Sequence, residues 1–262
     1  MSLELLITVF TCLLTLSLVI QTIEGMSLTR RSDVKDLWVW SIQKGDLRHT
    51  SPLIQSLFAL IFEDKTHFVH LIIRLCAALS LIIVPYSLTA IFLFISTVIL
   101  LIRWRGAFNG GSDFMTLVTV TGLVIGTSAS LFGDRDTAWT VAFWYITIHS
   151  VSSYFMSGAV KLFNQYWRHG SALTHFLDGG LYGPLTQRSL FKNPMVAKLA
   201  SWGFILWEIS FPVVLFDTEL AKVYCVTAFI FHLLVFRFFG LNRFVWAWVT
   251  TFPAILYCAG RL

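Results

Sequence analysis

Charged residues are scarce in this sequence. Asp, Glu, Lys and Arg make up 13% of its 262 residues, whereas 56% are hydrophobic. An ordinary soluble domain carries about 25% charged residues, so this composition excludes that class. The net charge of +5 indicates membrane orientation and not nucleic-acid binding, because membrane proteins concentrate Lys and Arg on the cytoplasmic side. The expected partner is the lipid bilayer.

The sequence also lacks the short motifs of several large enzyme classes. It contains no HExxH, P-loop, GxGxxG or GxSxG pattern, and its histidines do not repeat at i, i+4. The four cysteines stand apart in apolar segments without CxxC spacing, which indicates small buried apolar side chains. They are Cys12, Cys76, Cys225 and Cys258. No metal site is predicted.

Long apolar segments are what the sequence does contain. A transmembrane helix needs about 20 mostly apolar residues, and eight segments approach this length. They are 5–23, 67–85, 88–103, 113–132, 138–160, 198–216, 220–239 and 242–260. The first lacks a basic start and a small-residue cleavage site, so we expect a retained span and not a signal peptide. We predict an all-α, polytopic membrane bundle of about eight transmembrane helices, with seven or six as alternatives, in one domain covering residues 1–262.

Two features of the connections refine this prediction. Only Pro85-Tyr86-Ser87 separates the second and third segments, which we expect to form a helical hairpin, because one helix over 67–103 would be about 55 Å long. The connections 24–66 and 164–197 are long, and the apolar stretch 52–62 in the first is too short to span. We expect that stretch to lie in the interface or to re-enter the membrane.

Charge asymmetry between the connections predicts the orientation. If the first span runs from outside to inside, nearly all basic residues between spans become cytoplasmic and both termini are outside. The expected cytoplasmic residues include Arg30, Arg31, Lys35, Lys44, Arg48, Lys65, Arg103, Arg105, Arg168, Arg188, Lys192, Lys198, Arg237 and Arg243. The outer connections keep Arg135 and Lys222 beside acidic residues. We expect Arg237 and Arg243 to act as interface anchors.

The end of the fifth apolar segment carries the strongest candidate site. Residues 154–161 read YFMSGAVK, and residues 167–170 read WRHG. A lysine near the bilayer centre costs roughly 2.5–3.5 kcal/mol and less toward the interface, so Lys161 is either held by a partner or snorkels to the interface. A held lysine whose charge is disfavoured by burial can act as a base. Tyr154 lies on the same side of the helix, and Ser157 and Gly158 between them suit close helix packing.

Other polar residues lie within or beside the later segments. Glu208 stands in the middle of 198–216 and His232 within 220–239, and each is either functional or a paired core group. The loop Asn109-Gly110-Gly111-Ser112-Asp113 opens the fourth segment. Its simplest interpretation is a helix start capped by Ser112 or Asp113.

These residues together resemble the HTTM family, the membrane domain shared with vitamin K-dependent γ-glutamyl carboxylase. The resemblance covers roughly residues 100–255 and includes the Lys161 motif, the acid Glu208, and His232 followed later by Phe244. Gly111 stands where the carboxylase has a His, which favours the broader HTTM group.

The resemblance implies roles for the candidate residues. It implies that Lys161 is a base, aided by Tyr154, Glu208 and His232. It also implies that Asn109, Asp113 and Trp167 help to bind a lipophilic cosubstrate, for which a reduced quinone is the candidate. The implied location is the cell membrane, as a multi-pass protein of the bacterial inner membrane.

Two functions from different classes follow. The first is a membrane enzyme that modifies a peptide or small molecule. The second is a non-enzymatic membrane partner, similar to the small SdpB-type HTTM proteins, for maturing an exported toxin peptide. A transporter is a weaker third alternative, because no symmetric pair of broken helices is visible.

Overall fold

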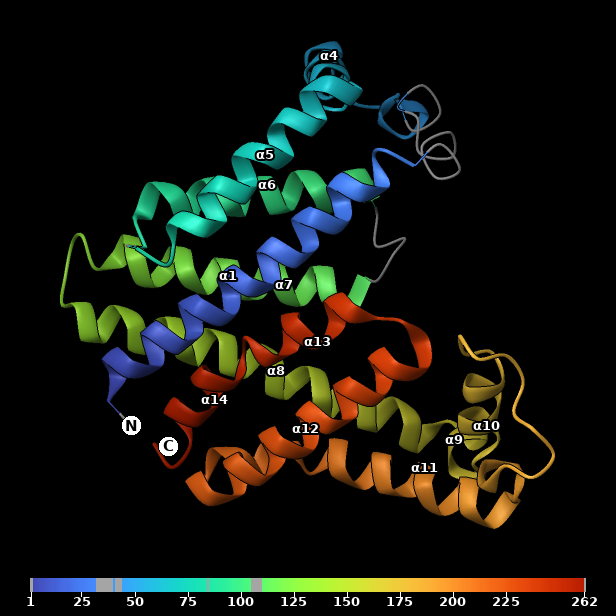
Figure 1. The fold of residues 1–262 in the computed structure, drawn as a ribbon. Helices are drawn as coiled ribbons and strands as arrows, with labels where there is room; N and C mark the ends of the chain where they lie inside the picture. The colour runs from blue at the N-terminus through green and yellow to red at the C-terminus, as the bar shows by residue number, and fades with distance from the viewer. Residues whose placement is uncertain (1, 32–39, 41–43, 84, 105–109, 262) are drawn as a thin grey trace.

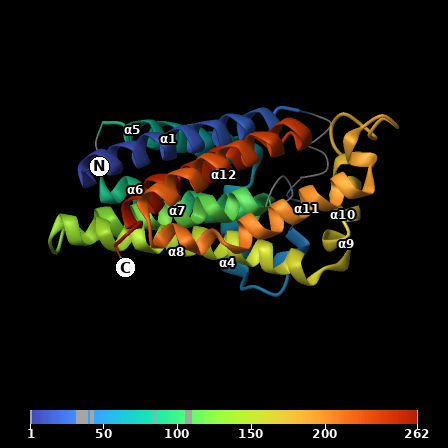
Figure 2. The same cartoon turned by 90° about the horizontal axis from the view of Figure 1, so that it is seen from below.

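The computed structural model of the chain describes residues 2–31, 40, 44–83, 85–104 and 110–261. Within these ranges the regular structure is entirely helical, so the predicted all-α bundle is confirmed. Figure 1 shows long helices lying side by side, with the chain reversing direction between most consecutive ones. Figure 2, seen from below, shows that both termini lie at the same end of the bundle, opposite α9 and α10.

The first part of the chain forms α1 (Leu3–Leu28), a short 3₁₀ turn η2 (Lys44–Leu47), α4 (Pro52–Ile61), α5 (Asp64–Ser80) and α6 (Ser87–Trp104). The hydroxyl of Ser2 caps α1 by accepting from the Leu5 N–H. Helices α5 and α6 pack against each other as an antiparallel pair, which confirms the predicted hairpin. The short helix α4 projects away from the bundle and has no buried residue.

The middle of the chain forms the longest helix. After α7 (Gly110–Ala129), helix α8 (Arg135–Phe163) is capped by Asp134, whose carboxylate accepts from the N–H of Thr137 at 2.8 Å. The hydrogen bond from the Thr137 hydroxyl, followed by this backbone one, holds the pKa of Asp134 below its usual value. The connection that follows contains α9 (Gln165–Arg168), α10 (Ser171–Asp178) and the 3₁₀ turn η3 (Leu190–Lys192).

The last part of the chain departs from the prediction in two places. The sixth apolar segment is α11 (Pro194–Ile209) followed by the 3₁₀ turn η4 (Phe211–Leu215), and the eighth is divided into α13 (Asn242–Val249) and α14 (Phe252–Cys258). Proline explains both breaks, because it lacks an N–H and its ring clashes with the preceding turn of a helix. Pro212 stands at the start of η4 and Pro253 at the start of α14. Between them, α12 (Thr218–Phe239) is continuous and ends at Gly240, whose φ is +71°.

The buried side chains form two main clusters that share α7, α8 and α14. One gathers around Phe10, Trp139 and Phe143, where α1 meets α7 and α8. The other gathers around Tyr154, Phe211 and Trp248, where α8 meets η4, α12 and α13. Many outward-facing side chains are also apolar, as expected for lipid contact. They include Cys12 and Cys76, which are exposed and not buried as predicted, because the faces of α1 and α5 that carry them point outward.

Within the part of the chain that the structure describes, four helices are long and apolar enough to cross a membrane: α1, α6, residues Gly111–Ala129 of α7, and α12. This supports association with a membrane. The remaining predicted spans are helical too, but α5 and α11 are shorter, with 17 and 16 residues. The count of eight crossings therefore stays a prediction.

Candidate functional site

The candidate site lies where α8 and α11 touch. Gly158 on α8 faces Glu208 and Ile209 on α11, and a Cβ at position 158 would stand 2.6 Å from the Ile209 backbone nitrogen. Real Cβ contacts are not that short, so only glycine permits this approach. The expected packing role of Gly158 is thereby found in the structure.

This close approach brings Lys161 and Glu208 together. The Lys161 ammonium lies 2.6 Å from Glu208 Oε2, and the side chains are only 16% and 3% exposed. Lys161 also donates to Ser157 Oγ at 2.6 Å, and Ser157 donates to Glu208 Oε1 at 3.1 Å. Lys161 is therefore held inside the bundle by a carboxylate from α11, and the snorkelling alternative does not apply.

An apolar cavity adjoins this ion pair. It has a volume of about 210 Å³, and Lys161 and Glu208 are the charged residues in its lining. Aromatic and aliphatic side chains from the connection, α11 and α12 make up the rest. They are Trp167, Leu173, Phe176, Leu177, Phe191, Phe204, Phe231, Leu234, Val235, Phe238 and Phe239. The Lys161 ammonium lies 5.2 Å from the centre of the Trp167 ring, close enough for a cation–π contact.

The next pair of candidates, Tyr154 and His232, is also joined. The Tyr154 hydroxyl lies 2.6 Å from His232 Nε2, and both residues are buried. Tyr154 stacks on Phe211 at 3.9 Å between ring centroids, and His232 stacks on Trp248 at 5.3 Å. His232 follows Phe231 of the cavity wall, so α12 carries both. The structure thus places Tyr154, Lys161, Glu208 and His232 in one region, between α8, α11 and α12.

Asp113 lies elsewhere. Its Oδ1 is 3.1 Å from Arg243 Nη2, and neither residue belongs to the described lining of the cavity beside Lys161. Arg243, which was expected to anchor the chain at the interface, does not point outward: its side chain is only 13% exposed and is held by this ion pair. Its place relative to the membrane interface stays a prediction. Asn109, the other residue proposed for this loop, lies outside the described residues.

Sequence reasoning missed Arg74. This arginine is fully buried on α5 and donates to Ser96 Oγ and Thr97 Oγ1, both at 3.0 Å, on α6. The signal was available, since an arginine in the middle of an apolar segment points to a buried polar partner.

Asp178 stabilises the connection between α8 and α11, which covers the cavity. This residue ends α10, which supplies Leu173, Phe176 and Leu177 to the cavity wall. Its carboxylate accepts from the Leu185 N–H at 2.8 Å and from Lys192 Nζ at 3.0 Å. The Leu185 hydrogen bond, followed by the one from Lys192, holds the pKa of Asp178 below its usual value.

Comparison with known proteins gives no relative: no family model matches the chain, and no curated protein or solved structure matches it.

Proposed function

We propose that this chain is an HTTM-type integral membrane protein that binds a lipophilic, quinone-like cosubstrate in the cavity beside Lys161. In this proposal Lys161 acts as a base while a peptide or small molecule is modified at the membrane. The observation that carries the proposal is the position of a buried ion pair in the wall of an otherwise apolar cavity. Such a cavity binds the apolar body of a ligand, and the few polar groups fix its orientation.

The lining of the cavity suits a flat ring. Seven aromatic side chains contribute to it: Trp167, Phe176, Phe191, Phe204, Phe231, Phe238 and Phe239. Aromatic rings stack favourably on one another, and the ion pair supplies hydrogen-bonding groups for a ring hydroxyl or carbonyl. A bound reduced quinone would supply an acidic hydroxyl group and two electrons.

In this proposal Glu208 accepts the proton that Lys161 must lose to become a neutral amine. Within the ion pair, one proton can move from the Lys161 ammonium to the Glu208 carboxylate, which leaves two neutral groups. An apolar cavity that excludes water disfavours separated charges, so the neutral pair is more accessible there than in water. The neutral Lys161 can then accept a proton from a ligand hydroxyl. Ser157 contacts both partners and orients them.

Tyr154 and His232 form the second proton-carrying pair of the proposed site. Their hydrogen bond fixes the His232 ring, and stacking on Phe211 and Trp248 holds both rings in place. In the proposal they position the wall of the cavity that carries Phe231 and exchange a proton with each other.

The second candidate function is the non-enzymatic one, a membrane partner for maturing an exported toxin peptide. The ion pair itself favours it, because a lysine and a glutamate that satisfy each other also clamp α8 to α11 without any chemistry. In that case a variant that preserves the ionic contact between α8 and α11 would keep the function.

The test is to identify what the cavity holds. Val235 lines the cavity, whereas Val226 lies on the same helix and is 59% exposed. The wild-type protein, Val235→Trp and Val226→Trp would be purified from membranes and extracted with organic solvent for mass spectrometry. We expect a quinone-class molecule with the wild type and Val226→Trp and its loss with Val235→Trp. Equal amounts in all three, or none in the wild type, would contradict the proposal.

A further inference from the structure

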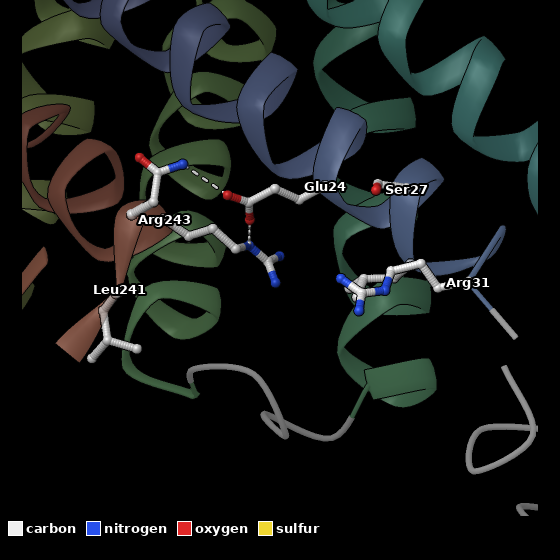
Figure 3. Close-up of a pocket in the computed structure, with 8 residues that line it drawn as sticks. Glu24, Ser27, Arg31, Leu241 and Arg243 are labelled. Atoms are coloured by element: carbon white, nitrogen blue, oxygen red, sulfur yellow. Dashed lines mark hydrogen bonds and ion pairs between the residues drawn. The ribbon is translucent and has the colours of Figure 1, made fainter. Parts of the chain in front are cut away.

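A second cavity, which has no part in the proposed function, lies near the end of α1. Its volume is about 300 Å³. Glu24 and Ser27 reach it from α1, Arg31 from the turn that follows, and Leu241 and Arg243 from the start of α13 (Figure 3). Two of these side chains are guanidinium groups, so the chemistry of the cavity differs from that of the apolar cavity beside Lys161.

Arg243 is fixed from two sides. Asp113 on α7 contacts its Nη2 at 3.1 Å. On the side of the cavity, Glu24 Oε2 lies 3.5 Å from its Nε, while Glu24 Oε1 accepts from Asn242 Nδ2 at 2.7 Å. The contact between Glu24 and Arg243 is long, and the buried Arg243 Nε makes no hydrogen bond within the described part of the chain. An arriving oxyanion can therefore replace Glu24 at an arginine whose position is already fixed.

Arg31 faces the same space. Figure 3 shows the guanidinium groups of Arg31 and Arg243 on opposite sides of the cavity, with the Glu24 carboxylate beside Arg243. Guanidinium groups match the geometry of phosphate and carboxylate oxygens through paired N–H donors.

An apolar groove continues from this cavity. It has a volume of about 490 Å³ and is lined by the apolar residues Ile23, Met26 and Leu75 and by Arg30, with Ser27 and Arg31 belonging to both spaces. Ile23 is 52% exposed. A ligand that occupies both spaces is amphiphilic, with an anionic group near the two arginines and an apolar chain along α1 and α5.

We propose that this composite site binds an anionic phospholipid, with its phosphate between Arg31 and Arg243 and an acyl chain over Ile23, Met26 and Leu75. The site lies at the end of α1 that carries Arg30 and Arg31, which charge asymmetry assigns to the cytoplasmic side. Anionic lipids are concentrated in that leaflet and bind basic pockets between helices.

The experiment measures binding of fluorescent phosphatidylglycerol to the purified full-length protein in detergent. Competitors are unlabelled phosphatidylglycerol, phosphatidylcholine and inorganic phosphate. Arg31→Gln is compared with Arg188→Gln, which removes the same charge from an exposed residue of the connection after α10. Glu24→Gln is compared with Glu63→Gln, which removes an exposed carboxylate before α5.

We expect phosphatidylglycerol to compete and phosphatidylcholine to compete weakly. Arg31→Gln should weaken binding by about fivefold, the effect of one basic residue near a lipid surface. Glu24→Gln should strengthen binding, because it removes the competing carboxylate, and both control variants should match the wild type. Equal competition by the two lipids, or equal losses in Arg31→Gln and Arg188→Gln, would overturn the proposal. Complete displacement by inorganic phosphate would assign the site to a free anion and overturn it as well.

Discussion

Gly158 and Glu208 lie so close that a Cβ at position 158 would stand 2.9 Å from the Cβ of Glu208. This approach lets the Glu208 carboxylate reach the Lys161 ammonium one helical turn further along α8. The ion pair, the Ser157 hydrogen bonds and the apolar cavity all depend on this one position without a side chain.

Gly158→Ala is expected to destabilise the protein. The added methyl group would clash with the α11 backbone, and overpacking of this kind costs roughly 1–3 kcal/mol. The matched control is Gly203→Ala on α11, where a Cβ would meet nothing within 4 Å. That variant should be neutral or stabilising, because alanine favours a helix over glycine by about 1 kcal/mol. Thermal unfolding in detergent compares the two, and similar stabilities would show that the helices do not approach as closely as described.

The Lys161–Glu208 pair predicts a recovery of stability in a double variant. Lys161→Met leaves a buried carboxylate without its partner, and breaking a buried pair costs roughly 3–5 kcal/mol. Adding Glu208→Gln removes the uncompensated charge, so the double variant should be more stable than Lys161→Met alone. The measurement is the free energy of unfolding of all four members of the cycle.

An exposed pair provides the control for that cycle. Lys222 and Glu219 also lie 2.6 Å apart, but their side chains are 50% and 78% exposed. Exposed pairs contribute roughly 0–1 kcal/mol, so Lys222→Met should have little effect. A loss as large as that from Lys161→Met would mean that burial does not distinguish the two pairs.

Acid is expected to loosen the connection that covers the cavity. Because the pKa of Asp178 is lower in the folded protein than in the unfolded chain, its contribution is fully present above the unfolded pKa. That contribution is lost as the pH falls through the folded pKa. The protection of residues 179–193 against hydrogen exchange, measured relative to the intrinsic exchange rate at each pH, should therefore fall in this acidic range in the wild type. Asp178→Asn should exchange faster already at neutral pH and depend less on acid; an unchanged wild-type profile would contradict this role.

The orientation can be tested by chemical labelling. Single cysteines at Asp136 and Arg188 would be introduced into a variant that lacks the four native cysteines. An impermeant thiol reagent applied to intact cells should label position 136, while position 188 should react only after the cells are opened. Equal labelling of both positions would contradict the arrangement with eight crossings.

The sequence was sufficient to locate most of the helices and to indicate that Lys161 needs a polar partner. Segments of about 20 apolar residues located the long helices, and a lysine at the end of one segment called for a partner such as Glu208. The breaks at Pro212 and Pro253 were also readable, since proline interrupts a helix.

The sequence did not predict which residues of distant segments contact each other. Arg243 follows an apolar segment and resembles an interface anchor, but it turns inward because Asp113, on α7, is there to receive it. That partnership depends on how α7 and α13 pack, and spacing along the chain does not encode it. The cavity beside Lys161 is similar, because its wall combines α8, α10, α11 and α12.

The most direct test of the proposed function uses Lys161→Arg, which keeps the positive charge and can keep the contact with Glu208 but cannot lose its proton. The protein would be reconstituted in vesicles with a reduced naphthoquinone in air-saturated buffer, and oxidation would be followed by absorbance. We predict oxidation by the wild type and by Val226→Trp, and none above background by Lys161→Arg, with the quinone still bound. Equal rates in the wild type and Lys161→Arg, or no oxidation by the wild type, would contradict the role of Lys161 as a base and favour the maturation-partner function.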